Sequence, residues 1–80
     1  MYTRADLEMA QRHVAEAERH ICQQEMTITR LMLAGLPIAN AETCLTLFNR
    51  TLELHRAHCN CIAHDLEQRG RLREDSGKTA

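Results

Sequence analysis

The feature that most constrains this chain is a pair of tandem seven-residue segments near its start. Arg12-His13-Val14 and Arg19-His20-Ile21 share the order arginine, histidine, β-branched apolar residue. The same spacing extends outward to Leu7 and Ile28, so an apolar line runs along one face of a helix. Such a line must be buried against another element. It predicts an amphipathic helix of about 31 residues, from about 4 to 34.

The expected ends of this helix carry capping residues. Thr3 followed by Asp6 resembles a capping box, in which two residues satisfy backbone N–H groups reciprocally. Gly35 is placed to take the left-handed C′ position. Leu36 can then fold back on Leu31 in a Schellman motif. We therefore expect the first helix to end just before Gly35.

A second helix is expected from about 37 to 69. Pro37 suits its first turn because the ring fixes φ at a helical value, and Asn40 is an alternative N-cap. Two seven-residue lines form its apolar seam: Ile38, Leu45, Leu52, Cys59 and Leu66, with Ala41, Phe48, His55 and Ile62. The pattern ends at Gly70. Residues 71–80 are polar, so we expect a frayed C-terminal tail.

Two helices of similar length joined by a short turn predict an all-α fold, an antiparallel two-helix hairpin of coiled-coil type over residues 1–70. In the expected register Ile21 lies opposite Phe48, and Val14 lies opposite His55. One proline and three glycines are too few for a β-protein. With no tryptophan, one tyrosine and one phenylalanine, the core must be aliphatic.

The register also predicts contacts beside the seam. Ala17 falls opposite Leu52, so a small residue faces a large one and the helices can approach closely. Glu18 and Arg56 lie at flanking positions, where we expect an ion pair worth under about 1 kcal/mol if it is exposed.

A single hairpin of this length buries little apolar surface, and small domains usually need a further partner or cross-link. The second helix carries a second apolar stripe that borders the seam: Cys44, Leu47, Leu54 and Cys61. The first helix has little equivalent. We therefore expect the second helix to bind through these residues, either in a homodimeric four-helix bundle or to a partner helical protein. Both alternatives need the same stripe, so the sequence leaves them open.

Potential metal ligands are concentrated in the second helix. His55, His58 and Cys61 follow one another at three-residue spacing, and the register adds His13 from the first helix. These four residues are candidate ligands for zinc or another borderline-soft ion. None of the usual zinc spacings, such as CxxC or HExxH, is present. We therefore favour surface histidines without a cofactor, and keep a metal or pH-sensing role as the alternative.

The two tandem histidines are expected to differ in their neighbours. In the hairpin register His13 lies across from His58, whereas His20 faces only Thr51. Of the two repeats, only the first therefore has a second histidine beside it, with which it can share a ligand.

Composition argues against several functional classes. No serine lies beside a base and no glycine-rich phosphate loop is present, so we expect no enzymatic activity. The net charge of −1 comes from mixed acids and bases without a basic face, which argues against nucleic-acid binding. No apolar run approaches the ~20 residues of a membrane span. Residues 1–6 lack the apolar region of a signal peptide, so we expect a cytoplasmic protein.

The chain has four cysteines, which we expect to be reduced thiols in a cytoplasmic protein. Cys59 lies on the seam, where it serves as a small apolar residue. Cys22 is expected to be the most exposed and is the best candidate for oxidation.

A longer pattern includes Asp6-Leu7, the two tandem segments, Gly35, and Leu54-His55-Arg56-Ala57-His58. It resembles small helical-hairpin proteins of alphaproteobacteria, whose sequences repeat an RHV/ERHI run and end in a TLxLHxxH run. The resemblance covers residues 6–67, departs at Pro37, and implies a bacterial cytosolic setting but no activity. Together the patterns predict a non-enzymatic helical interaction or oligomerisation module. The alternative is a His/Cys metal-binding or redox- or pH-sensing protein.

Overall fold

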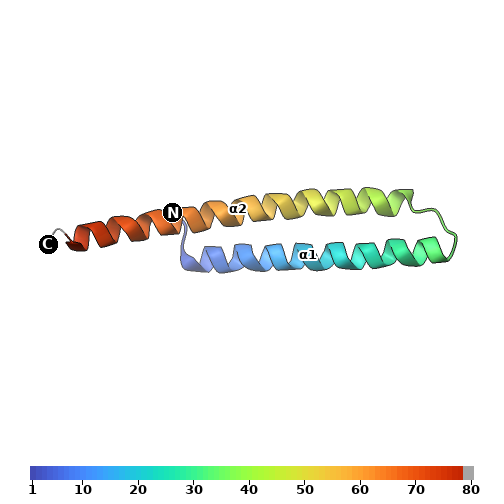
Figure 1. Cartoon of the computed structure of the whole chain (residues 1–80), viewed down its shortest axis with the longest axis horizontal. Helices are drawn as coiled ribbons and strands as arrows, with labels where there is room; N and C mark the ends of the chain where they lie inside the picture. The colour runs from blue at the N-terminus through green and yellow to red at the C-terminus, as the bar shows by residue number, and fades with distance from the viewer. Residues whose placement is uncertain (79–80) are drawn as a thin grey trace.

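The computed structural model describes the backbone of residues 1–78 and the side chains of residues 1–72. Two helices, α1 (Arg4–Leu33) and α2 (Ala39–Lys78), account for nearly all of this range. They lie side by side and run in opposite directions, and α2 extends well past the start of α1 (Figure 1). The described chain contains no strand. The prediction of an all-α, two-helix hairpin is therefore confirmed.

Both predicted caps of α1 are present. The Thr3 backbone N–H donates to the Asp6 carboxylate at 2.8 Å, and the Asp6 N–H donates to Thr3 Oγ1 at 3.2 Å. Gly35 takes the left-handed conformation with φ of 70°, and the Leu36 N–H donates to the Leu31 carbonyl at 2.9 Å. These are the hydrogen bonds of a capping box and of a Schellman motif, so both ends of α1 are fixed by local sequence.

The connection between the helices is longer than predicted. α2 begins at Ala39 rather than at 37, so Pro37 lies outside the helix and Asn40 lies inside it instead of capping it. The first hydrogen bond of α2 runs from the Glu42 N–H to the Ile38 carbonyl at 2.8 Å. The reason is geometric. Helix axes pack about 8–10 Å apart, and crossing that gap takes about three extended residues at roughly 3.3 Å each.

The prediction for the end of α2 is also wrong. Residues 71–78, expected to form a frayed tail, continue the helix instead of following its end at 69. The last two residues of the expected tail, 79 and 80, lie outside the described part of the chain.

Gly70 does not stop α2 because a glycine inside a helix costs only about 1 kcal/mol relative to alanine. Two ion pairs with i,i+4 spacing lie near it. Asp65 pairs with Arg69 at 2.9 Å just before the glycine, and Glu67 pairs with Arg71 at 2.7 Å across it. Such pairs each stabilise a helix by a few tenths of a kcal/mol. Propagation of an existing helix is therefore easier here than termination.

The core is thin and lies in the seam between the helices. Among the described side chains only four residues are buried, namely Ala10 and Ala17 of α1 with Leu52 and Ile62 of α2. Ile62 is the most enclosed, with 1% of its surface exposed. Because both α1 members are alanines, the helix backbones can approach closely at these points. The remaining seam residues are half-buried.

The register agrees with the sequence prediction to within one residue. The ring of His20, the neighbour of Ile21, contacts Phe48 on α2. Arg56 contacts Glu18 across the hairpin at 3.3 Å, so the predicted ion pair is confirmed. Both of these side chains are more than half exposed, and the pair therefore adds little to stability.

Candidate functional site

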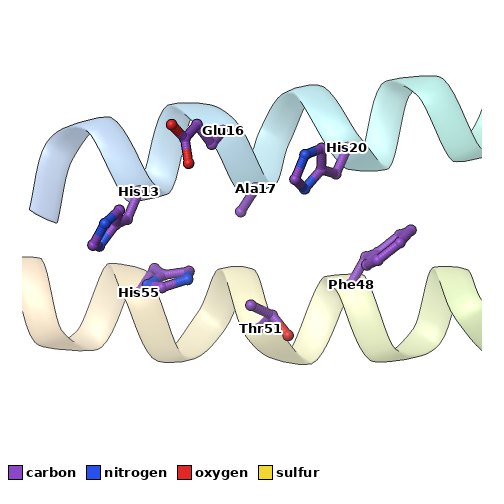
Figure 2. A pocket seen from close by; sticks show the side chains of 7 residues that line it. All are labelled: His13, Glu16, Ala17, His20, Phe48, Thr51 and His55. Atoms are coloured by element: carbon purple, nitrogen blue, oxygen red, sulfur yellow. The ribbon is translucent and has the colours of Figure 1, made fainter.

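A groove with a volume of about 190 Å³ opens between α1 and α2 on one side of the hairpin (Figure 2). Its lining residues are His13, Glu16, Ala17, His20, Phe48, Thr51 and His55. Those of α1 lie three, four and seven residues after His13, which places them on one helix face. Ala17 is buried and has no side chain beyond Cβ. It therefore leaves space between the imidazole rings of His13 and His20, which lie on either side of it along α1.

The groove contains two equivalent layers of cross-helix ring contacts. In the first, the ring centres of His13 and His55 are 5.3 Å apart, with their planes tilted by 49°. In the second, the ring centres of His20 and Phe48 are 6.0 Å apart, with a tilt of 42°. The partners of the two layers are separated by seven residues on each helix. The layers are therefore matched in position and differ chiefly in whether α2 supplies histidine or phenylalanine.

This arrangement corrects the predicted neighbours of both tandem histidines. His13 pairs with His55 rather than with His58, although His13 and His58 both line a neighbouring groove. His20 contacts Phe48 and does not face only Thr51, which also lines the groove. Seam residues of α2 therefore reach the flanking residues of α1 directly.

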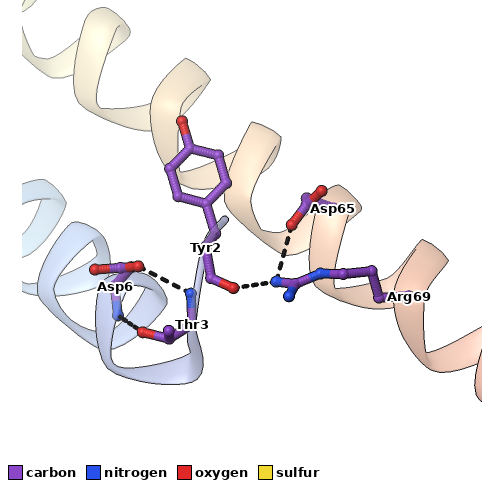
Figure 3. Close-up of polar contacts among 5 residues, drawn as sticks. All are labelled: Tyr2, Thr3, Asp6, Asp65 and Arg69. Carbon is purple, nitrogen blue, oxygen red and sulfur yellow. Dashed lines mark hydrogen bonds and ion pairs between the residues drawn. The ribbon is translucent and has the colours of Figure 1, made fainter.

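His58 has a different partner because the start of the chain crosses α2. The ring of Tyr2 meets that of His58 edge to face, with centres 5.9 Å apart. The Tyr2 carbonyl accepts a hydrogen bond from the Arg69 guanidinium, which also pairs with Asp65 (Figure 3). This contact holds the N-terminal residues against α2 and brings the Tyr2 ring to His58.

The four metal-ligand candidates are thus divided. The structure brings His13 and His55 together, while His58 contacts Tyr2 and Cys61 is exposed outside the groove. Within the described residues, no group of three or more His, Cys, Asp or Glu side chains is placed to hold a metal ion. A site built from all four candidates is therefore not assembled in this structure.

Sequence reasoning missed two features of the groove. Glu16 lines it with the histidines, although the sequence prediction assigned this residue to no site. Its spacing of three residues from His13 and four from His20 was the available signal. Phe48 was expected only as a core residue, yet it is half-buried and exposes part of its ring to the groove.

A second candidate surface lies on the outer face of α2. All four residues of the predicted stripe, Cys44, Leu47, Leu54 and Cys61, are exposed in the single chain. Leu54, near the middle of α2, has 72% of its surface exposed, and Leu47 has 52%. α1 therefore does not cover this stripe. Cys22 is exposed as expected, Cys59 is half-buried in the seam, and all four thiols are free.

No known protein family, curated protein or solved structure matches this chain. The resemblance to alphaproteobacterial hairpin proteins remains a prediction from the sequence. Among the described residues, neither helix has an apolar stretch long enough to cross a bilayer.

Proposed function

We propose that this protein is a non-enzymatic helical interaction module that self-associates through the outer face of α2. The observation that carries the proposal is the exposure of Leu54, the central residue of the stripe. A fully buried leucine stabilises a folded protein by about 1.5–3 kcal/mol relative to an exposed one. In the isolated hairpin the leucines of the stripe are exposed, so they contribute little of this stabilisation.

Single exposed leucines are ordinary on protein surfaces, so the spacing matters more than the number. Leu47, Leu54 and Cys61 recur every seven residues, and therefore stay on one side of α2 over two heptads. A second helix packed along α2 meets residues at this interval. The stripe thus has the period of a helix-binding surface.

A second copy of the chain is the occupant we propose for the stripe. When two α2 helices meet antiparallel about a two-fold axis at Leu54, that residue faces its own copy and Leu47 faces Cys61 of the other chain. The surface is then self-complementary, as a two-fold interface requires. The resulting assembly is a four-helix bundle with α2 helices at its centre.

The small size of the grooves supports a non-enzymatic role. The groove lined by His13 and His55 has a volume of about 190 Å³, and three other described grooves have volumes of about 290 to 340 Å³. Typical small-molecule sites span roughly 300–1,000 Å³, so these grooves lie near or below the lower end of that range.

Light scattering at micromolar protein concentration tests self-association directly. We expect the unchanged chain to have the mass of a dimer, and Leu54→Glu to have the mass of a monomer because it places a charge at the centre of the interface. Met26→Glu is the matched control. Met26 is also an exposed apolar helix residue, but it lies near the turn on α1. This variant should stay dimeric.

A monomeric mass for the unchanged chain contradicts the proposal. A dimeric Leu54→Glu variant contradicts the placement of the interface on α2. In the first case a helical partner of a different sequence becomes the remaining explanation of the stripe.

A further inference from the structure

We propose that His13 and His55 together bind one divalent transition-metal ion, which bridges α1 and α2. The ion is of the class that imidazole ligands favour, from Ni²⁺ to Zn²⁺. The site lies in the groove and uses none of the residues of the outer α2 stripe (Figure 2). This inference is independent of self-association.

The separation of the two rings fits a shared ion. An imidazole nitrogen lies about 1.1 Å from its ring centre, and a Zn–N bond is about 2.0–2.1 Å long. Two imidazoles on one tetrahedral ion therefore have ring centres about 5.2 Å apart. The centres of His13 and His55 are 5.3 Å apart. The spacing of the two rings is thus already that of a two-histidine chelate.

The chain supplies two ligands to this site and water supplies the others. Within the described residues no third His, Cys, Asp or Glu completes the set, so the site is open rather than of the closed structural kind. Glu16 lines the same groove and places a negative charge near the ion. One ligand comes from each helix, so binding holds the helices together at this layer.

Metal binding must therefore stabilise the hairpin. The two histidines are separated by 42 positions in the chain and come together only when it folds. A ligand that binds the folded state alone raises the unfolding midpoint. At free zinc about tenfold above its Kd, a domain of this size should gain roughly 5–10 °C.

The second layer of the groove is a built-in control. His20 occupies the same position in its heptad as His13, but its partner on α2 is Phe48. Removing His20 deletes an exposed histidine from the same groove without touching the pair. Replacing Phe48 with histidine recreates the His13–His55 arrangement one layer away.

Isothermal titration with zinc chloride, together with thermal unfolding followed by circular dichroism, tests the proposal on the full chain. We expect one equivalent of zinc and a raised midpoint. His13→Gln should weaken zinc affinity by about 100-fold. It leaves His55 as the single protein ligand, so the affinity no longer benefits from a second ligand held nearby in the same folded chain. His13 is exposed, so this change leaves the fold intact. His20→Gln should bind as the unchanged chain does, and Phe48→His should bind a second equivalent.

Two results would overturn the site. One is the absence of zinc binding at tens of micromolar. The other is equal binding by the unchanged chain and His13→Gln, which would place the ion on other ligands such as the exposed thiols of Cys44 and Cys61. If Phe48→His does not fold, the comparison of His13→Gln with His20→Gln still decides the outcome.

Discussion

Ala17 sets the spacing of the two helices at the centre of the hairpin. It is buried in the seam, and its lack of a longer side chain leaves the space that forms the floor of the groove. Interhelical distance depends on the side chains at the contact. The residue therefore controls both how closely the helices pack and how near His13 and His55 lie to each other.

Ala17→Leu should lower the free energy of unfolding by about 1–3 kcal/mol, because extra carbons in a closely packed seam force the helices apart. Urea unfolding followed by helical circular dichroism measures the change. Ala15→Leu is the matched control because Ala15 is exposed on the same helix. Alanine and leucine have similar helix propensities, so that variant should unfold near the urea midpoint of the unchanged chain. Equal midpoints for both variants would show that Ala17 does not set the spacing.

At the scale of the helix, two glycines have opposite roles. A Cβ added at either Gly35 or Gly70 meets no atom within 4 Å. Only the backbone distinguishes them. Gly35 has φ of 70°, which l-amino acids with a side chain rarely adopt, whereas Gly70 lies within the continuous helix α2. The glycine after α1 is required by its turn, and the glycine in α2 only weakens the helix.

Gly70→Ala should stabilise the last turns of α2 by about 0.5–1 kcal/mol. This gain in stability should slow the hydrogen exchange of the amides around residue 70 about two- to fivefold. Gly35→Ala, the matched change, should lower the global stability by about 1–2 kcal/mol because it forces a side chain into the left-handed region. Faster exchange in Gly70→Ala would mean that the helix ends near residue 70 after all.

At the scale of the whole molecule, stability and assembly are linked. The described hairpin buries only four residues and leaves the α2 stripe open. If two copies share that stripe, much of the apolar burial forms between chains. The folded state then depends on protein concentration, as in dimers whose monomers are only marginally stable.

Each tenfold increase in protein concentration should therefore raise the thermal midpoint by about 3–6 °C for a dimer of this combined size. Calorimetric or circular dichroism melts over a hundredfold concentration range measure this. In Leu54→Glu the midpoint should be lower and should not change with concentration. A constant midpoint for the unchanged chain would argue for a monomer.

Local and periodic features of the fold could be predicted from the sequence. The caps at Thr3 and Gly35 involve residues within a few positions of one another, and the seven-residue lines define which face of each helix is buried. The end of α2 could not be predicted in the same way. A glycine stops a helix only when the chain gains more by turning. The two residues after Gly70 whose side chains are described, Arg71 and Leu72, are both exposed.

The candidate site was predicted only in part. The heptad register brought His13 to the correct end of α2, and this much follows from helix geometry. Which histidine it meets depends on a rotation of less than one helix turn, since His55 and His58 lie three residues apart. The Tyr2 ring against His58 depends on the path of the first residues of the chain. No periodic pattern describes that path.

The length of the hairpin affects how the molecule diffuses. Its extents are 71 × 16 × 14 Å, and its radius of gyration is 19.3 Å. A compact chain of this length has a radius of gyration of about 12 Å, and one of twice the length about 15 Å. A single hairpin therefore has a larger radius of gyration than a compact dimer. Elution volume alone will overestimate its mass, and rotation about its long axis will be much faster than end-over-end rotation.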